Sequence, residues 1–437
     1  MQNAYDMLHE RGLIEQVSDE NALRESFGRE TLTLYAGFDP TADSLHLGHL
    51  LPVLCLARLQ RMGHRPISLV GGATAMIGDP SGRSEERQLL GEDTIEANSV
   101  RIRAQLERFL DFSGSNAAIM VNNADWTKGV TYLSWLRDVG KHFSVNSMLG
   151  KESVRKRIEE RIHGISYTEF SYMLIQANDF LQLYDLYGCR LQVGGNDQWG
   201  NITAGIDLIH KRRHVQAYGI TFPLLTTSSG EKFGKSAGNA IWLDPEKTSL
   251  YAMYQYWIRT DDRDVAWYLR YFTFLSREDI AELERTVREA PEKRAAQRVL
   301  AEEATRMIHG DEGLRKAERA SRLLFGEGGF DGFTDREILD VFADVPSSTV
   351  TRGELGQGIG ALSMFTRAGL SKSNSQALKM IRQGGLYVNS VRVENSRLVL
   401  TPDHLEGRKV MVLRAGKKRY HLIRVEGETV GGKSADM

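Results

Sequence analysis

The chain has 437 residues, 41% hydrophobic and 26% charged, which suits two or three ordinary globular domains. Its only cysteines, Cys55 and Cys189, lie far apart, so there is neither a disulfide framework nor a CxxC zinc pattern, and a reducing, cytoplasmic compartment is expected. No apolar run approaches the roughly 18 residues that span a membrane, and the N-terminus lacks the pattern of a signal peptide.

Charge is unevenly distributed along the chain. Residues 361–437 hold 14 basic and 6 acidic residues, whereas the whole chain holds 56 and 57. A basic C-terminal module on an acidic body predicts a polyanionic partner, although an unevenly charged solvated surface would give the same balance.

The first half of the chain alternates strand and helix patterns. Strands are expected at 31–38, 65–72, 118–126, 189–195 and 219–226, and helices after the first strand and at 94–113, 166–187 and 199–212. This alternation predicts an α/β fold with a parallel, Rossmann-like sheet. Ligands of such sheets lie beyond the carboxyl ends of the strands, where the loops 36–49, 71–87 and 122–127 are expected.

Composition divides the chain further. We expect a catalytic domain at 1–245 with an inserted segment at about 128–165, a helical domain at 246–344 and a Ser/Thr/Gly-rich linker at 345–361. A small α+β module follows at 362–430, with a tail at 431–437. In this module Ser373 and Gln376 predict a capped helix that stops at Gly384, and Asn389-Ser390 predicts the turn of a hairpin.

The tetrapeptide HLGH contains His46 and His49, which follow the first strand and share one face of a helical turn. A helix start with two imidazoles favours phosphate. The alternatives are two ordinary surface histidines or a zinc pair, for which no further ligand lies near in sequence. Tyr35, Gly37 and Asp39 alternate onto one face of the strand, and Gly37 leaves room for a ligand to approach the backbone.

The segment KFGKS carries Lys232 and Lys235 in a glycine-flanked loop. Such a loop could neutralise phosphate charge that develops in a transition state. The alternatives are a solvated surface loop and a P-loop, because Gly234-Lys235-Ser236 matches the end of the P-loop pattern. The first glycine of that pattern would fall on Ser229, which argues against a P-loop.

The helix expected at 166–187 has a polar stripe on an otherwise apolar surface. Tyr172, Gln176 and Asp179 lie at i, i+4 and i+7, on one face. The stripe is either a buried, satisfied hydrogen-bond network or the wall of a small polar pocket.

A glycine-rich segment, GGNDQWGN, follows the strand expected at 189–195. Its glycines permit close approach to a nucleoside, and Asp197 could accept from ribose hydroxyls beside Gln198. A tight turn with a capping aspartate is the alternative. There is no GxGxxG pattern, which argues against a dinucleotide-dependent oxidoreductase.

Together these segments resemble class I aminoacyl-tRNA synthetases, since HLGH is similar to their HIGH motif and KFGKS to their KMSKS motif. The strings YAGFDPTADSLHLGHL, GDPSG, TEFSYMLIQANDF and GGNDQWGN resemble the bacterial-type tyrosyl-tRNA synthetases in particular. The C-terminal SKSNSQALKMIRQGGLYVNSVRV resembles the S4 RNA-binding module of that family. The resemblance implies a Rossmann-like catalytic domain, a helical tRNA-binding domain and an S4-like domain.

The resemblance also implies an activity and partners. Tyrosine would react with ATP to give tyrosyl-adenylate and pyrophosphate, and the tyrosyl group would then pass to the terminal adenosine of tRNA(Tyr). ATP would be a substrate that carries Mg²⁺ on its phosphates, with no tightly bound cofactor and no protein metal site. The family is homodimeric, and the insertion at about 128–165 is the expected interface; no membrane is involved.

Site residues follow from the same resemblance. The catalytic group at the triphosphate would be His46, His49, Lys232 and Lys235. Tyrosine would be bound by Tyr35 and Asp179 at the phenol and by Thr74, Asp79, Tyr172 and Gln176 at the ammonium. ATP would be bound by Gly37, Asp39, Gly48, Gly195, Asp197, Gln198, Lys235 and Ser236. The tRNA would meet Lys372, Lys379 and Arg382, while the roles of Arg83 and Arg87, in a loop that the family uses near phosphate, stay open.

Two other classes of function compete at this point. One is the related tryptophanyl enzyme, or a class I nucleotidyltransferase that acts on a small acid without RNA. The polar pair Tyr35 and Asp179 suits a phenol better than an indole, and the basic C-terminal module argues against an RNA-free reaction. The other is a non-catalytic RNA-binding protein, against which the intact HLGH and KFGKS motifs argue.

Overall fold

The computed structural model describes residues 2–81, 90–159, 164–230, 233–236, 239–324, 328–416 and 419–426. These residues form two units, one of Met1–Thr248 with Arg259–Ile308 and one of Ser249–Ile258 with His309–Met437. Helix α14 (Ala295–Leu323) contributes to both, and its helical backbone is interrupted at Gly310, where φ is 73° and ψ is 179°. Among the described residues, no helix is both long enough and apolar enough to cross a membrane.

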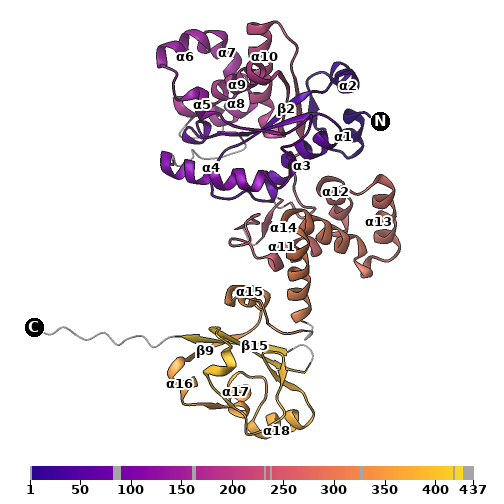
Figure 1. Ribbon diagram of the computed structural model, residues 1–437, viewed down its shortest axis with the longest axis vertical. Coiled ribbons are helices and arrows are strands. Elements are labelled where there is room, and N and C mark those ends of the chain that lie inside the picture. The colour runs from indigo at the N-terminus through magenta and orange to yellow at the C-terminus, as the bar shows by residue number, and fades with distance from the viewer. Residues whose placement is uncertain are drawn as a thin grey trace, which may run out of the picture. The chain divides into compact units, whose positions relative to one another are not determined.

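The first unit is built on a six-stranded sheet in the order β1-β6-β5-β2-β3-β4 (Figure 1). Strands β2 to β6 are parallel and β1 is antiparallel to β6, which confirms the predicted α/β class. The strands are β1 (Gln16–Val17), β2 (Thr33–Phe38), β3 (Arg65–Val70), β4 (Ile119–Asn122), β5 (Cys189–Gly195) and β6 (Tyr218–Phe222). The last of these is shorter than expected because Pro223 has no N–H to donate to the sheet.

Helices cover both faces of this sheet, with α3 and α4 on one face and α9 and α10 on the other (Figure 1). The helices of the unit, apart from its part of α14, are α1 (Ala4–Glu10), α2 (Glu20–Arg29), α3 (Leu47–Arg61), α4 (Glu92–Leu106), α5 (Ala124–Thr127), α6 (Tyr132–Asp138), α7 (Val145–Leu149), α8 (Glu152–Glu159), α9 (Tyr167–Tyr187), α10 (Trp199–Arg213), α12 (Asp262–Phe272) and α13 (Arg277–Glu289). Successive strands run outward from β2 to β4 in one direction and from β5 to β6 in the other. The strand order therefore reverses between β2 and β5, where open parallel sheets bind ligands.

Helix α9 confirms the helix predicted at 166–187. The Ser166 hydroxyl accepts from the Glu169 N–H (3.2 Å), and Gly188 ends the helix with φ 64°. Its apolar face buries Met173 and Phe180 in the core of the unit. This burial holds the polar stripe of α9 close to the end of the sheet.

The second unit contains a five-stranded sheet in the order β12-β11-β14-β15-β9 and a small pair β10-β13. The strands are β9 (Ser347–Thr351), β10 (Ile359–Gly360), β11 (Leu386–Val388), β12 (Val391–Arg392), β13 (Val399–Leu400), β14 (Val410–Ala415) and β15 (Arg419–Glu426). The helices, besides its part of α14, are α11 (Leu250–Ile258), α15 (Asp335–Val341), α16 (Arg352–Gly356), α17 (Ala361–Arg367) and α18 (Asn374–Arg382). The hairpin predicted at Asn389-Ser390 is confirmed: both residues have positive φ, and Val388 pairs with Val391.

The linker predicted at 345–361 is wrong. Residues 347–360 form β9, α16 and β10, and β9 pairs in parallel with β15. Val350 and Leu355 are fully buried in the core of the C-terminal sheet. The Ser/Thr/Gly composition is typical of a linker because β9 is an edge strand in which only Val350 is buried, and because Thr351 and Glu354 form a capping box for a short helix.

Candidate active site

A continuous hydrogen-bonded chain links two carboxylates at the carboxyl end of the first sheet. The Tyr172 hydroxyl and the Thr74 hydroxyl donate to the two oxygens of Asp39, at 2.8 and 2.7 Å. The Asn123 amide donates to the Thr74 hydroxyl (3.0 Å) and to Asp179 Oδ2 (2.9 Å). The chain joins residues from four separate segments, so these side chains hold one another in place.

Among the described residues, Asp179 is the most deeply buried carboxylate, at 1% exposure. Its Oδ1 accepts from the Trp126 indole (2.8 Å), and its Oδ2 accepts from Asn123. Burial raises the pKa of Asp179, and its effect exceeds that of the two donors, which stabilise the ionised form, so that the pKa is about 7. Asp179 therefore titrates close to neutral pH.

Tyr35 lies on β2 within the same core, fully buried beside Phe180. Burial raises the pKa of its phenol well above the ordinary value, and the nearby charge of Asp179 adds to the effect. The Tyr35 hydroxyl has no hydrogen-bond partner among the described residues, and neither does Gln192 Oε1 on the neighbouring strand β5, in register with Tyr35. A buried donor and a buried acceptor of this kind need an explanation, and a polar ligand provides one.

A second group of polar side chains surrounds Asp79, which is 8% exposed. The Gln198 amide donates to Asp79 Oδ2 (2.7 Å), and Asp79 Oδ1 accepts from the Ser81 N–H (2.9 Å). Asn201 in turn donates to Gln198 Oε1 (3.1 Å). This group connects the loop after β3 to the GGNDQWGN segment after β5.

The HLGH segment forms the start of α3 through a reciprocal cap. The Gly48 N–H donates to His46 Nδ1 (3.0 Å), and the His46 N–H donates to His49 Nδ1 (3.2 Å). The two imidazole centroids are 3.9 Å apart. Because a backbone N–H occupies each Nδ1, each neutral ring carries its proton on Nε2, so both imidazoles are N–H donors at a positive helix end.

The described part of the KFGKS segment docks directly on this helix start. A side chain at Gly234, where φ is 77°, would meet Leu47 Cβ at 3.1 Å and Gly48 N at 3.3 Å. The Ile241 N–H donates to the Gly234 carbonyl (2.8 Å), and the Leu47 N–H donates to the Ile241 carbonyl (2.9 Å). The two motifs, nearly 190 positions apart in the sequence, are therefore neighbours in space.

The structure brings together most of the residues that the sequence singled out. Tyr35, Thr74, Tyr172 and Asp179 meet around the first chain of hydrogen bonds; Asp39, expected at ATP, also belongs to it. Gly37 is exposed at the end of β2, and no atom lies within 4 Å of the position of an added Cβ. Gln176 is half-buried on α9, the helix that also carries Tyr172 and Asp179.

Some predicted residues cannot be placed in the site. Lys232, Arg83 and Arg87 lie outside the described residues, while for Lys235 and Ser236 the structure describes the backbone of a short strand, β7, paired with β8 (Asn239–Ala240). Lys372, Lys379 and Arg382 belong to the second unit, where all three are exposed at α18. The catalytic candidates belong to the first unit.

Two important residues escaped the sequence analysis. Asn123 and Trp126 hold both oxygens of Asp179, and Asn123 is fully buried. The available signal was a pair of asparagines at the end of the expected strand 118–126, in a loop already predicted to lie at the carboxyl end of the sheet. Polar side chains at that edge bind neighbouring loops or ligands, but their partners lie more than 40 positions away in sequence.

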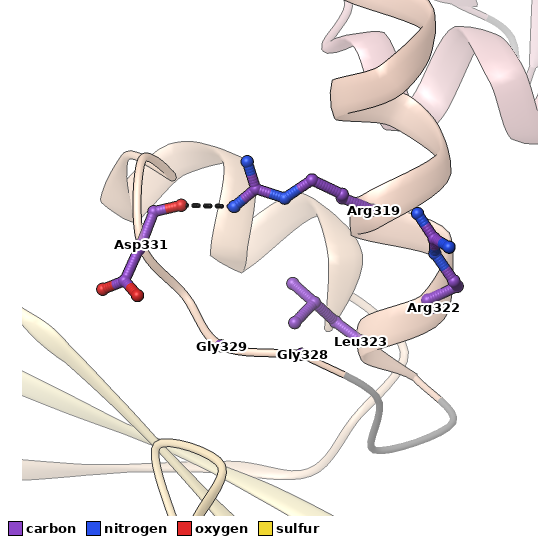
Figure 2. Close-up of a pocket in the computed structure, with 6 residues that line it drawn as sticks. All are labelled: Arg319, Arg322, Leu323, Gly328, Gly329 and Asp331. Carbon is purple, nitrogen blue, oxygen red and sulfur yellow. Dashed lines mark hydrogen bonds between the residues drawn. The ribbon is translucent and has the colours of Figure 1, made fainter.

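One pocket of about 270 Å³ lies in the second unit and is unrelated to these networks. Figure 2 shows that its two arginines come from the end of α14 and lie apart from each other. Arg319 donates to the Asp331 carbonyl (2.6 Å). Within the described residues, no group of three or more His, Cys, Asp or Glu side chains could hold a metal ion.

Comparison with known proteins identifies the family. Residues 28–326 match the tRNA synthetases class I (W and Y), and residues 337–423 match the tyrosine–tRNA ligase SYY-like C-terminal domain. The chain is 54% identical to a tyrosine–tRNA ligase of Geobacillus stearothermophilus over 417 residues, which covers 95% of this chain and 97% of the relative. It is 50% identical to a tyrosine–tRNA ligase of Rhodopirellula baltica, with 95% of each covered.

A solved structure agrees with this result. A C-terminally truncated mitochondrial tyrosyl-tRNA synthetase of Aspergillus nidulans superimposes with a TM-score of 0.68 at 34% identity, and the match covers 74% of this chain and 95% of that one. The sequence matches and the fold thus agree with each other and with the polar site at the reversal of strand order. The chain belongs to the tyrosine–tRNA ligase family of class I tRNA synthetases.

Proposed function

We propose that this tyrosine–tRNA ligase forms tyrosyl-adenylate at the carboxyl end of the six-stranded sheet and then transfers the tyrosyl group to the terminal adenosine of tRNA(Tyr). The observation that carries the proposal is the hydrogen-bonded chain from Asp39 to Asp179, beside the Tyr35 hydroxyl, which has no partner among the described residues. Such a site offers polar partners in an otherwise apolar core, as recognition of a phenol requires. The buried thiols of Cys55 and Cys189 fit the proposed cytoplasmic location.

The phenol of tyrosine would lie between Tyr35 and Asp179. Its O–H would donate to the Asp179 carboxylate, and the Tyr35 hydroxyl would donate to the phenol oxygen. A phenylalanine ring would leave the buried Tyr35 hydroxyl without a partner and would offer no donor to the Asp179 carboxylate, which is a large penalty. Indole differs in shape and offers a single N–H, so tryptophan would satisfy the pair poorly.

The ammonium of tyrosine would lie among the carboxylate-rich polar groups on the other side. Asp79 and Asp39 supply negative charge, and Tyr172 and Thr74 orient Asp39. Gln176 faces the same side of α9 as Tyr172, one helical turn away. Asp39 was predicted at ATP, and its hydrogen bonds to Tyr172 and Thr74 would also bring it to the ammonium, between the amino acid and the nucleotide.

The adenylate-forming step needs positioning and charge stabilisation rather than a protein nucleophile. A carboxylate oxygen of tyrosine would attack the α-phosphorus of ATP, and pyrophosphate would leave with the electrons of the broken P–O bond. His46 and His49 would donate from Nε2 to the phosphates beside Gly48, and Lys232, Lys235 and Ser236 would approach from the KFGKS loop. Mg²⁺ would enter on the ATP phosphates.

The nucleoside would lie along the GGNDQWGN segment. Gly195 permits close approach of the backbone there, and a side chain in its place would meet Asp197 Oδ1 at 2.5 Å. Asp197 would accept from ribose hydroxyls, with Gln198 beside it and Gly37 across the reversal of strand order. Asp79 and Gln198 would therefore couple the ammonium and nucleoside ends through their 2.7 Å hydrogen bond.

Pyrophosphate exchange into ATP tests this proposal directly. The purified protein is expected to support exchange with tyrosine and to give no more than background with tryptophan or phenylalanine. Exchange without an amino-acid preference would overturn the assignment of Tyr35 and Asp179. Exchange with tryptophan alone would show that the substrate is tryptophan, as for the related tryptophanyl enzyme.

The tRNA would be held in part by α18 of the second unit. Lys379 and Arg382 are three apart on its exposed face, and Lys372 precedes its cap. Replacing all three by Ala should weaken tRNA binding and reduce the slope of log K against log salt by about three, since each cation neutralises one phosphate. Tyrosine-dependent pyrophosphate exchange should stay within about twofold of wild type; an unchanged salt slope would contradict the role of α18.

The chain would act as a homodimer through the insertion at 128–165. This segment carries several exposed apolar side chains, among them Leu133 at 76% exposure, with Tyr167 at 66% on the adjoining helix. Leu133→Glu should weaken self-association by roughly two orders of magnitude, because an unpaired carboxylate would be buried. Sedimentation over a concentration series measures this. Val100→Glu, at an exposed site on α4 (61%), is the matched control, and an equal response of both variants would place the interface elsewhere.

A further inference from the structure

A buried arginine lies in the last turn of α3, away from the HLGH cap. Arg58 is 3% exposed, and its Nη2 donates to the carbonyls of Tyr271 (2.7 Å) and Thr273 (2.8 Å). Its Nε and Nη1 are also buried and have no hydrogen-bond partner in the part of the chain that the structure describes. A guanidinium that is desolvated and incompletely bonded costs stability, so its position calls for an explanation.

The carbonyls that Arg58 binds form the C-terminal end of α12. A cation is favourable there because the helix end carries partial negative charge. That end is already served by Arg11, which donates to the carbonyls of Arg270 (2.9 Å) and Leu275 (2.7 Å). Burial, together with the smaller effect of the charge of Arg11, lowers the pKa of Arg58 to about 9. Capping alone therefore does not account for the second, more costly arginine.

Helix α12 also holds the segment that contains KFGKS. Phe233, inside the motif, stacks on Phe272 with centroids 4.7 Å apart and an interplanar angle of 8°. Near the other end of α12, the Asp264 carboxylate accepts from the Ser228 N–H (2.9 Å) and from its hydroxyl (3.0 Å). Two residues of this segment, Ser228 and Phe233, are thus attached to α12. In the sequence they lie on either side of Lys232.

The other end of Arg58's own helix carries the two histidines. From His46 to Arg58, α3 rises about 18 Å as one continuous helix. We propose that Arg58 is a positioning residue for adenylate formation: by fixing α12 to α3, it holds the KFGKS loop in place relative to HLGH. This inference rests on the proposed function, because it assigns Arg58 to the step that uses both motifs.

The experiment compares Arg58→Met with Arg11→Met in the full-length chain. Both variants remove one cation from the same helix end, but only Arg58 belongs to α3. Arg58→Met should lower kcat for tyrosine-dependent pyrophosphate exchange by about 10²-fold, since a displacement of about 1 Å has such an effect on a positioned reaction. The Kd for tyrosine should stay within about twofold, and Arg11→Met should leave kcat within about threefold. Equal losses in both variants, or a tyrosine Kd that weakens in step with kcat, would show a plain helix cap and overturn the inference.

A second comparison keeps the inference testable if Arg58→Met does not fold. Arg58→Lys retains the charge with a shorter reach, and Asp264→Asn weakens the other attachment of the loop. The double variant combines Arg58→Lys with Asp264→Asn. If Arg58 acts through α12, the fold-reduction in its kcat should be smaller than the product of the fold-reductions in the two single variants. Independent losses would contradict the inference. Absence of tyrosine-dependent exchange in the wild-type protein would instead reject the proposed function itself.

Discussion

Replacing Asp179 by Ala is expected to weaken tyrosine binding by at least about 10- to 100-fold and to leave the KM for ATP within about twofold. A hydrogen bond to a buried charged group contributes about 1.5–3 kcal/mol, and the substitution also leaves the Asn123 and Trp126 donors unpaired. ATP would bind on the far side of Asp39, so its contacts would survive. Equilibrium binding of tyrosine and the KM for ATP in pyrophosphate exchange measure the two effects. An equal loss of both affinities would contradict the role of Asp179.

The raised pKa of Asp179 gives the same prediction a pH dependence. Burial moves this pKa from 3.8 to about 7, so between these values the folded protein binds a proton that the unfolded chain has released. Because the folded protein holds more protons than the unfolded chain in this window, the free energy of unfolding falls as pH rises through it. Tyrosine binding changes in the opposite direction, because only the carboxylate accepts from the phenol: the affinity should fall as pH drops below about 7.

Trp126→Phe is the matched control for this titration. The Trp126 indole donates to Asp179 Oδ1 at 2.8 Å and thereby lowers the pKa of the carboxyl group. Its loss should raise that pKa, so the midpoint of the tyrosine-binding profile should shift to higher pH while the affinity at high pH largely remains. In Asp179→Asn, which cannot ionise, the dependence near pH 7 should disappear. A midpoint that is the same in wild type and Trp126→Phe would exclude Asp179 as the titrating group.

Local patterns predicted the elements that are fixed by nearby residues. Helix α9 matches the range predicted for it, with Ser166 and Gly188 as its caps, and the hairpin turns at Asn389-Ser390, because caps and tight turns depend on only a few residues. The parallel sheet also followed from the alternation of strands and helices. The segment around β9 was misread because its structure depends on pairing with β15, more than 70 positions later.

The sequence predicted many residues of the candidate site, but not the hydrogen bonds that connect them. Tyr172 and Asp179 were correctly placed on one helix face, but the stripe alone could not decide between a satisfied network and a pocket. The structure shows features of both: Asp39 and Asp179 are hydrogen-bonded, while the hydroxyl of Tyr35 has no partner among the described residues. Asn123 and Trp126 were missed because a hydrogen bond between distant segments has no periodicity in sequence.

The contact between the HLGH and KFGKS motifs could not be predicted from local sequence patterns either. A glycine in KFGKS reads as loop flexibility in the sequence, whereas in the structure Gly234 permits contact with Leu47 and Gly48 that any side chain would disturb. The sequence could pair HLGH with KFGKS only through family resemblance. Their spatial relation comes from the backbone bonds at Ile241 and from the long-range packing of α12.

His46 is expected to have two separable roles, in stability and in rate. His46→Ala removes the acceptor of the Gly48 N–H, which should lower the free energy of unfolding by about 1 kcal/mol, as for other helix caps. It also removes the Nε2 donor that would face the phosphates, and loss of one such donor lowers kcat by about 10²- to 10³-fold. Urea unfolding and single-turnover adenylate formation measure these two effects.

His46→Asn separates the two roles, because an asparagine side chain is a good helix cap but cannot place a donor where Nε2 stands. The free energy of unfolding should therefore return to within about 0.5 kcal/mol of wild type while the rate stays low. Recovery of the rate together with stability would mean that His46 acts only by shaping the start of α3. A low rate in a fully stable protein would instead assign the imidazole to the phosphates. Asparagine would then have replaced the helix cap of His46 but not its Nε2 donor.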